Sequence, residues 1–359
     1  MERTDPLAGP RASKVAVYRD PPAHAHEAGL EARGPVRVPL EVQGLSTTLF
    51  TRRGEMKAVD GLSLAVGVGE TVALVGESGC GKSLSALSIM RLLPDPPARI
   101  VGGAVKLNGR DIVPVAEEAM LDIRGKEIGM IFQDPMSSLN PVTTVGKQIA
   151  EVLTTHTELG GGQARTRAHE LLELVGMPDA GRRLDAYPHQ LSGGMCQRVM
   201  IAMAIACRPS VLIADEPTTA LDVTVQAQVL ALLKRLQADA GMAMIFITHD
   251  LGVVAETADR VVVMYAGRKV EEASVDELFE NPLHPYTAGL IGATPVPGAA
   301  RADRLADIPG MVPPLNALPQ GCAFAPRCPR VMERCWREKP HLTEPAPGRQ
   351  VACFAAERG

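Results

Sequence analysis

The sequence has few aromatic residues, no excess of basic charge and no long apolar run. Phe, Trp and Tyr make up 3% of its 359 residues, which leaves little material for stacking the bases of single-stranded nucleic acid. The formal net charge is -4, whereas proteins dedicated to nucleic acid usually carry a basic surface. We therefore do not expect nucleic acid to be the main partner of this chain.

Membrane-spanning and secretory segments are also missing from the sequence. No apolar run approaches the roughly 18–20 residues of a membrane helix, and the stretch "VMIAMAIAC" at 199–207 has the length of a core segment. The N-terminus lacks a basic segment followed by an apolar one, so we expect no signal peptide. A cytoplasmic setting keeps thiols reduced, and the seven cysteines then do not form a disulfide framework.

The pattern of the chain changes near residue 39. Residues 1–38 are rich in Pro, Ala, Arg and His without periodicity, which predicts a disordered N-terminal tail. Further on, apolar runs alternate with helical stretches, and runs of this kind are typical of strands buried on both faces of a mostly parallel sheet. The fold class is therefore α/β. The expected strands are 71–76, 128–132, 210–215, 243–248 and 260–267.

Helical segments and a second region surround these strands. We expect a helical subdomain at about 134–200, which includes "QARTRAHELLELVG", and a further helix at 223–239. Ser274 and Glu277 form a capping-box pattern before the short helix "SVDELFE". A proline-rich stretch then leads into a group of cysteines. We divide the chain into a core at 39–270 and a C-terminal extension at 271–359.

The stretch "GESGCGKS" fits the phosphate-binding pattern G-x-x-x-x-G-K-[ST] and lies between an expected strand and an expected helix. Its glycines let backbone N–H groups turn toward phosphates, and the positive end of the new helix points at them. The lysine reaches the β- and γ-phosphates, and the final serine binds Mg²⁺. ATP and Mg²⁺ are the expected cofactors of a P-loop (RecA-like) core. The residues are Gly76, Glu77, Ser78, Gly79, Cys80, Gly81, Lys82 and Ser83.

Two adjacent carboxylates follow the expected strand 210–215 in "SVLIADEP". Asp215 is suited to hold the metal, and Glu216 is placed to polarise an attacking water as general base. A solvated strand end is the alternative for such a pair. The phosphate loop elsewhere in the chain favours the catalytic interpretation.

Further motifs show a resemblance to the ATPases of ABC transporters. "LSGGMCQR", with Ser192, Gly193 and Gly194, resembles their signature sequence, although Met195 stands where Gln is commonest. Other matches occur in the family's order. They are Phe50 for the aromatic that stacks on adenine, Gln133 for the Q-loop, Asp222 for the D-loop and His249 for the switch histidine.

The resemblance implies how these residues act. Two ATPase subunits meet head to tail, and the signature of one completes the nucleotide site of the other. Gln133 joins Ser83 and Asp215 in organising Mg²⁺ and water, and His249 positions the γ-phosphate. Asp222 helps to couple the two sites. The helical subdomain and the Gln133 loop pass motion to membrane subunits.

One subgroup, the ATPases of oligopeptide and dipeptide importers, is the most similar. "LSGGMCQRVMIA" resembles its signature variant, and "NPLHPYT" with His284, Pro285 and Tyr286 resembles the start of its C-terminal extension. This implies ATP-driven peptide import at the cytoplasmic face of the membrane. The implied partners are two permeases, an external solute-binding protein and a second homologous ATPase. Import of nickel, glutathione or a sugar is an alternative, and a non-transport ABC ATPase acting on nucleic acid is a more distant one.

Four cysteines lie close together near the C-terminus, at Cys322, Cys328, Cys335 and Cys353. Four thiolates suit either zinc or a [4Fe–4S] cluster, and buried cysteines without a metal are the third alternative. The wide and uneven spacing, together with the resemblance, favours the cluster. We expect this region to be structural or regulatory.

Overall fold

The computed structural model describes residues 38–52, 54–219, 221–294 and 308–356. Except for Val38, the tail predicted at 1–38 lies outside the described residues. Within them, no helix is both long and apolar enough to cross a bilayer.

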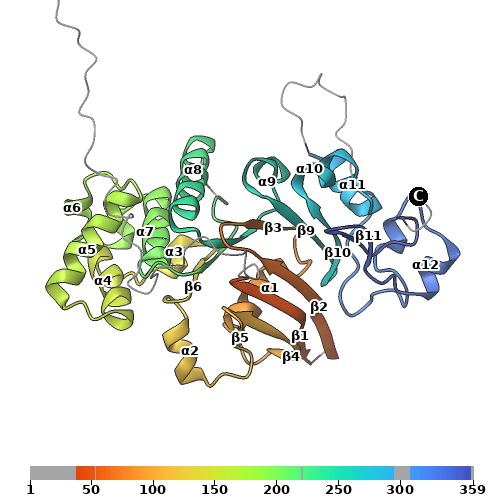
Figure 1. The fold of residues 1–359 in the computed structure, drawn as a ribbon, viewed down its shortest axis with the longest axis horizontal. Coiled ribbons are helices and arrows are strands. Elements are labelled where there is room, and N and C mark those ends of the chain that lie inside the picture. The colour runs from red at the N-terminus through yellow and green to blue at the C-terminus, as the bar shows by residue number, and fades with distance from the viewer. Residues whose placement is uncertain (1–37, 53, 220, 295–307, 357–359) are drawn as a thin grey trace, which may run out of the picture.

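The main sheet runs through the centre of the molecule (Figure 1). Its strand order is β11-β12-β10-β9-β3-β8-β7-β6, and the five strands from β9 to β6 are parallel. These five are the expected strands, because their side chains are apolar and buried almost throughout. Their bounds are β3 Thr71–Val75, β6 Ile128–Ile131, β7 Val211–Asp215, β8 Ala243–Ile247 and β9 Arg260–Tyr265.

Helices cover this sheet, and those between β6 and β7 form an insertion. The green and yellow-green helices of the insertion gather at one end of the molecule in Figure 1. They pack around α7, whose residues Val199 and Ile201 are fully buried. The insertion comprises α3 Pro135–Ser138, α4 Val145–His156, α5 Gly161–Leu174, α6 Ala180–Arg183 and α7 Gly193–Ile205. The remaining helices of the core are α1 Lys82–Met90, α2 Glu117–Ile123, α8 Val223–Ala240 and α9 Leu251–Thr257.

A second sheet, not anticipated from the sequence, lies against α1. It is antiparallel, with the order β2-β1-β4-β5, and its apolar side chains share one core with α1 and the main sheet. It consists of β1 Leu40–Thr51, β2 Gly54–Val66, β4 Ala98–Leu107 and β5 Arg110–Asp111.

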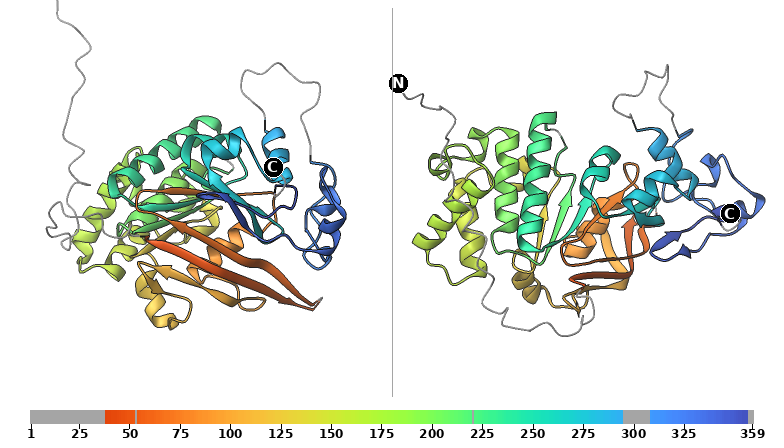
Figure 2. Two further views of the ribbon diagram at one scale, coloured as in Figure 1. Left: turned by 45° about the vertical axis from the view of Figure 1, so that its right-hand side comes forward. Right: turned by 45° about the horizontal axis from the view of Figure 1, so that its top comes forward.

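The C-terminal extension continues the main sheet. β10 Arg268–Ser274 pairs with β9, and β12 Arg349–Val351 returns from the end of the chain to pair with β10. β11 Thr343–Ala346 completes the edge. Figure 2 shows the blue end of the chain on the opposite side of the molecule from the helical insertion.

Short helices and aromatic packing fix the extension to the core. Its helices are α10 Val275–Glu280, α11 Pro285–Gly292 and α12 Glu333–Arg337. Ser274 accepts a hydrogen bond from Glu277 N, which is the first contact of the capping box. The Glu277 carboxylate accepts from the Ser274 hydroxyl instead of from the Ser274 backbone N–H that the pattern predicts. Tyr265 of β9 makes edge contacts with Tyr286 and Phe324. The extension is therefore packed directly on the strand beside the phosphate loop.

Candidate nucleotide site and cysteine cluster

The phosphate loop connects β3 to α1, as the sequence predicts. Gly76 and Gly81 have φ values of 148° and 106°, which strongly favour glycine. A Cβ atom at Gly76 would lie 2.3 Å from Met264 O, and one at Gly81 would lie 2.5 Å from Ala58 O. Close backbone packing therefore requires these glycines. Ser78 and Gly79 at the tip are exposed, so the phosphate-facing side is open.

Lys82 is held inside the loop. Its Nζ donates to Gly76 O at 2.7 Å and to Glu77 O at 3.2 Å, and it lies 3.9 Å from the buried Cys80 Sγ. Burial raises the pKa of the Cys80 thiol, which keeps it neutral beside the lysine. A lysine bonded to two carbonyls of its own loop is placed to turn toward phosphate.

The predicted metal ligands come together at the end of β7. Ser83 Oγ donates to Asp215 Oδ1 at 3.0 Å, although the two residues are 132 positions apart. Burial of Asp215 raises the pKa of its carboxyl, and the hydrogen bond from Ser83 opposes this shift. A divalent cation between these oxygens would favour the ionised carboxylate.

Three other side chains contact the Glu216 carboxylate. Gln133 Nε2 donates to Glu216 Oε2 at 3.0 Å, and Thr219 Oγ1 donates to the same oxygen at 2.9 Å. His249 Nδ1 lies 3.4 Å from Glu216 Oε1. The structure thus joins the predicted base to Gln133 and His249. Thr219 was missed by sequence reasoning, and its position three residues after Glu216 is the only signal for it.

Gln133 differs from its expected place in one respect. The family resemblance implies that it lies with Ser83 and Asp215 around Mg²⁺, and in this structure its amide binds Glu216. An amide side chain can exchange such a partner, and its role toward the metal stays a prediction.

The signature residues lie at the start of α7, apart from the phosphate loop. Ser192 caps the helix and its Oγ accepts from Met195 N at 3.4 Å. Ser192 and Gly193 are exposed, and nothing lies within 4 Å of a Cβ built on Gly193. In the described chain, no hydrogen bond connects Gly193 or Gly194 to the phosphate loop. An open helix N-terminus with no nucleophile or metal ligand is consistent with a site that a partner completes.

Two further predicted residues lie at the edges of this region. Asp222 caps α8 by accepting from Val225 N at 2.9 Å, so its carboxylate has a local structural role. Phe50 lies on β1 opposite Glu55 and is 41% exposed. Its stacking on adenine stays a prediction.

Two residues of the extension contact the phosphate loop, and sequence reasoning gave neither a role there. Tyr286 Oη accepts a hydrogen bond of 2.8 Å from Glu77 N. The Arg327 guanidinium binds the Glu77 carboxylate through two contacts, of 2.6 and 3.0 Å. The only signal was the "HPYT" motif that contains Tyr286.

The four C-terminal cysteines face one small cavity, which His284, Phe324 and Phe354 also line. All four are free thiols, and Cys322 N donates to Cys335 O at 2.7 Å. Burial, followed by the proximity of the other thiols, raises the pKa of Cys322 to about 11. In the described parts of the chain, however, no three His, Cys, Asp or Glu side chains are arranged to hold a metal ion. The sequence thus predicts the gathering of the thiols, whereas metal-binding geometry is not preformed.

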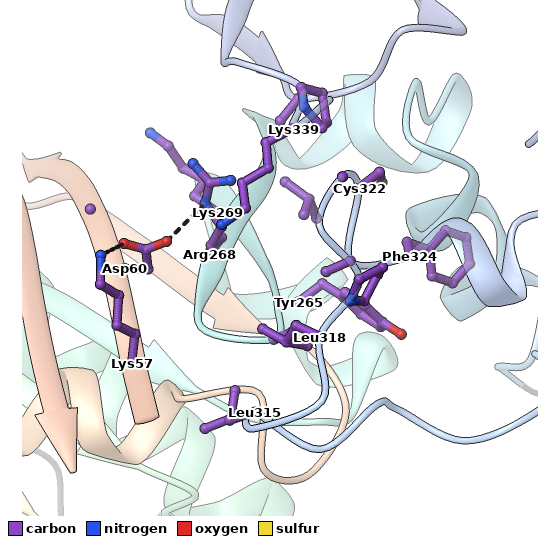
Figure 3. Close-up of a pocket in the computed structure, with 18 of the residues that line it drawn as sticks. Lys57, Asp60, Tyr265, Arg268, Lys269, Leu315, Leu318, Cys322, Phe324 and Lys339 are labelled. Carbon is purple, nitrogen blue, oxygen red and sulfur yellow. Dashed lines mark hydrogen bonds and ion pairs between the residues drawn. The ribbon is translucent and has the colours of Figure 1, made fainter. Parts of the chain in front are cut away.

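A separate cavity of about 550 Å³ lies between β2, the β9–β10 turn and the extension (Figure 3). Asp60 lies between Lys57 and Arg268, at 3.4 and 3.5 Å from their nitrogens. None of the motif residues described above lines this cavity except Cys322 and His284. The cavity is therefore distinct from the open nucleotide site.

Comparison with family models gives two matches. Residues 59–219 match the family described as ABC transporter. Residues 270–335 match the one described as oligopeptide/dipeptide transporter, C-terminal region. The first match contains the phosphate loop, and the second contains three of the four clustered cysteines, Cys322, Cys328 and Cys335.

Curated relatives are similar along almost their whole length. The oligopeptide transport ATP-binding protein AppD of Bacillus subtilis is 52% identical over 89% of this chain and 97% of its own. The dipeptide transport ATP-binding protein DppD of Escherichia coli is 50% identical over 88% of this chain and 95% of its own.

Solved structures match the core. The ATP-binding cassette MJ0796, in a dimeric post-hydrolysis state bound to ADP and Pi, has a TM-score of 0.60 and 28% identity. The match covers 66% of this chain and 98% of that one.

Proposed function

Because the chain belongs to the ABC transporter ATPase family, in its oligopeptide/dipeptide transporter group, we propose that it powers the import of peptides. One observation carries this proposal. One chain contains a complete set of ATPase motifs together with a peptide-transporter C-terminal region. The similar peptide-transport proteins align with this chain across both regions.

ATP hydrolysis follows from the arrangement of the core. The loop amides and Lys82 bind the phosphates, while Ser83 and Asp215 lie where they would hold Mg²⁺, which neutralises phosphate charge when bound. Glu216 is the general base and takes a proton from the attacking water. Its contacts with Gln133 and Thr219 orient the carboxylate. His249 would then contact the γ-phosphate from the other side of Glu216.

The open signature supports pairing with a second ATPase subunit. Ser192, Gly193 and Gly194 are anion donors that would bind the nucleotide held by a second ATPase subunit, and Asp222 would couple the two sites. The dimeric form of the MJ0796 cassette supports such pairing. We propose a distinct homologous ATPase as the partner, together with two permeases and an external solute-binding protein. The chain would then be peripheral, at the cytoplasmic face of the membrane.

A [4Fe–4S] cluster is our proposal for the four cysteines, with Zn²⁺ as the alternative. Four thiols around one cavity, with no disulfide among them, provide the donors that either metal centre requires. Binding would ionise the thiols and draw them together. Anaerobic purification with iron and zinc analysis distinguishes the two: a brown, iron-containing protein supports the cluster, and a colourless zinc protein supports the alternative.

Co-purification tests the transport function. The tagged chain, expressed in its own organism, should be recovered with two integral membrane permeases and a second ATPase. Salt-sensitive recovery with DNA or RNA and without permeases would favour a non-transport ABC ATPase. If the recovered permeases belong with a solute-binding protein for nickel, glutathione or a sugar, the chain is still a transport ATPase, but the transported solute is not a peptide.

A further inference from the structure

The phosphate loop is anchored from outside the ATPase core at Glu77. The two anchoring residues, Tyr286 and Arg327, are 209 and 250 positions away in the sequence. Tyr286 accepts from the backbone N–H of Glu77, and Arg327 binds its side chain. One loop residue is therefore held through both its main chain and its carboxylate.

Both anchors are buried. Tyr286 is fully buried, and the Arg327 side chain is 3% exposed. The Arg327 guanidinium also donates to Pro309 O at 2.9 Å and to Ile308 O at 3.2 Å, which fixes its plane. A guanidinium with two parallel contacts to one carboxylate is both strong and directional. The contact of Arg327 with Glu77 therefore differs from a surface ion pair, because the guanidinium is buried and held by further hydrogen bonds.

Glu77 also connects these anchors to the lysine that binds phosphate. Lys82 Nζ donates to Glu77 O, and it has to leave this carbonyl in order to reach ATP. The loop then loses an internal contact just when its N–H groups must keep their orientation. The contacts from Tyr286 and Arg327 do not involve Lys82 and can persist through that change.

Charge gives Arg327 a second effect. The Glu77 carboxylate belongs to the loop that receives a polyanion, and its side chain is 29% exposed. An unpaired carboxylate there would repel the phosphates of ATP. Arg327 neutralises this charge from the side of the extension.

We propose that Arg327 and Tyr286 are positioning residues for the phosphate loop, and that the C-terminal extension thereby sets the affinity of the ATPase for nucleotide. This inference rests on the ATPase activity and on neither the peptide substrate nor a metal at the cysteines. It gives the extension a role in nucleotide binding.

The test measures the Kd for MgATP and the KM and kcat of hydrolysis, with the full chain in its assembled complex. Arg327→Met leaves the carboxylate unpaired and should raise Kd and KM about tenfold, equal to about 1.4 kcal/mol, with kcat within about twofold. Arg327→Lys should lie between this variant and the wild type. Tyr286→Phe, which removes only the hydroxyl, should raise Kd about threefold.

The decisive comparison is the double variant. Glu77→Gln alone should raise Kd by about threefold, because the loop loses an anchor but gains no repulsion. Glu77→Gln combined with Arg327→Met should bind MgATP better than Arg327→Met alone, because the unpaired charge is gone. Arg337→Met is the matched control, since Arg337 is an exposed arginine of the same extension paired with Glu333.

Two outcomes would overturn the proposal. If Arg327→Met lowers thermal stability and leaves Kd for MgATP unchanged, Arg327 only docks the extension. The second outcome concerns the double variant. If its change in the free energy of MgATP binding equals the sum of the changes in the two single variants, the two residues act independently. Because Glu77 and Tyr286 lie outside the cysteine cluster, their variants keep the test valid even where Arg327→Met fails to fold.

Discussion

Gln133 Nε2 donates a 3.0 Å hydrogen bond to Glu216 Oε2. Gln133 follows β6 at the entry to the helical insertion, and Glu216 follows β7. Glu216, the proposed base, is thus hydrogen-bonded to the segment that begins the insertion. We propose that a displacement of the insertion against the sheet moves Gln133 and thereby changes the position of the Glu216 carboxylate.

Glu216→Gln should slow ATP hydrolysis by about 10²–10⁴, the usual contribution of a positioned base, and leave MgATP binding intact. The amide keeps the size of the side chain but cannot accept the proton of water. Turnover and MgATP affinity in the assembled complex check this. Glu280→Gln, an exposed residue of α10, controls for the lost charge, and near-normal turnover in Glu216→Gln would remove Glu216 from its role.

Ser192→Arg should leave ATP binding by the isolated chain unchanged while lowering turnover of the assembled complex by about 10²–10³, the cost of losing a pre-oriented anion donor. The reason is that Ser192 is exposed and its hydroxyl caps α7, a helix that does not belong to the phosphate loop. Equilibrium binding and steady-state hydrolysis are the two measurements. Thr166→Arg on the same insertion is the control. Weakened binding in the isolated chain would mean that Ser192 serves its own site.

In the His284→Asn variant, the free energy of unfolding should fall less steeply than in the wild type as the pH is lowered. Burial lowers the pKa of His284 to about 3, whereas an unfolded histidine titrates near about 6.5. Between these values only the unfolded state binds the proton. The free energy of unfolding therefore falls by up to about 1.4 kcal/mol per pH unit as the pH drops.

Asn fits this test because its side-chain oxygen can replace His284 Nδ1, which accepts from Tyr286 N at 3.0 Å. Denaturant unfolding at a series of pH values gives the slopes. The exposed His341→Asn is the control. Equal slopes for wild type and His284→Asn would show that His284 does not carry this dependence.

Cys335→Ser should abolish the visible absorption and iron content of the anaerobically purified protein, and should lower its melting temperature more than Cys207→Ser does. Cys335 is one of the four clustered thiols, whereas Cys207 lies at the end of the insertion and lines no part of that cavity. Loss of a ligand removes the folding free energy that metal binding supplies. Iron retained at the wild-type level in Cys335→Ser would contradict the proposed ligand set.

The sequence predicted the parallel strands well because each is apolar on both faces, a pattern that survives without tertiary information. It did not reveal the antiparallel sheet. The pairing of β1 with β2 and β4 shifts register between Val42 and Thr48, and such irregularities break the alternation that marks a half-buried strand.

In the candidate site, too, some residues could be predicted from the sequence and others could not. Lys82, Ser83, Asp215 and Glu216 belong to local motifs, so their spacing predicts their chemistry. The contact between Arg327 and Glu77 has no local pattern, since it joins two ordinary charged residues from distant segments. Only the fold brings them together.

Peptide uptake driven by ATP is the most direct test of the central claim. The chain is reconstituted in proteoliposomes with its partner ATPase and two permeases, with ATP on the side of the ATPases and labelled oligopeptide plus solute-binding protein on the other. We predict uptake that requires ATP and the solute-binding protein and that stops with Glu216→Gln. ATP hydrolysis without transport of any peptide bound by that protein would contradict the account.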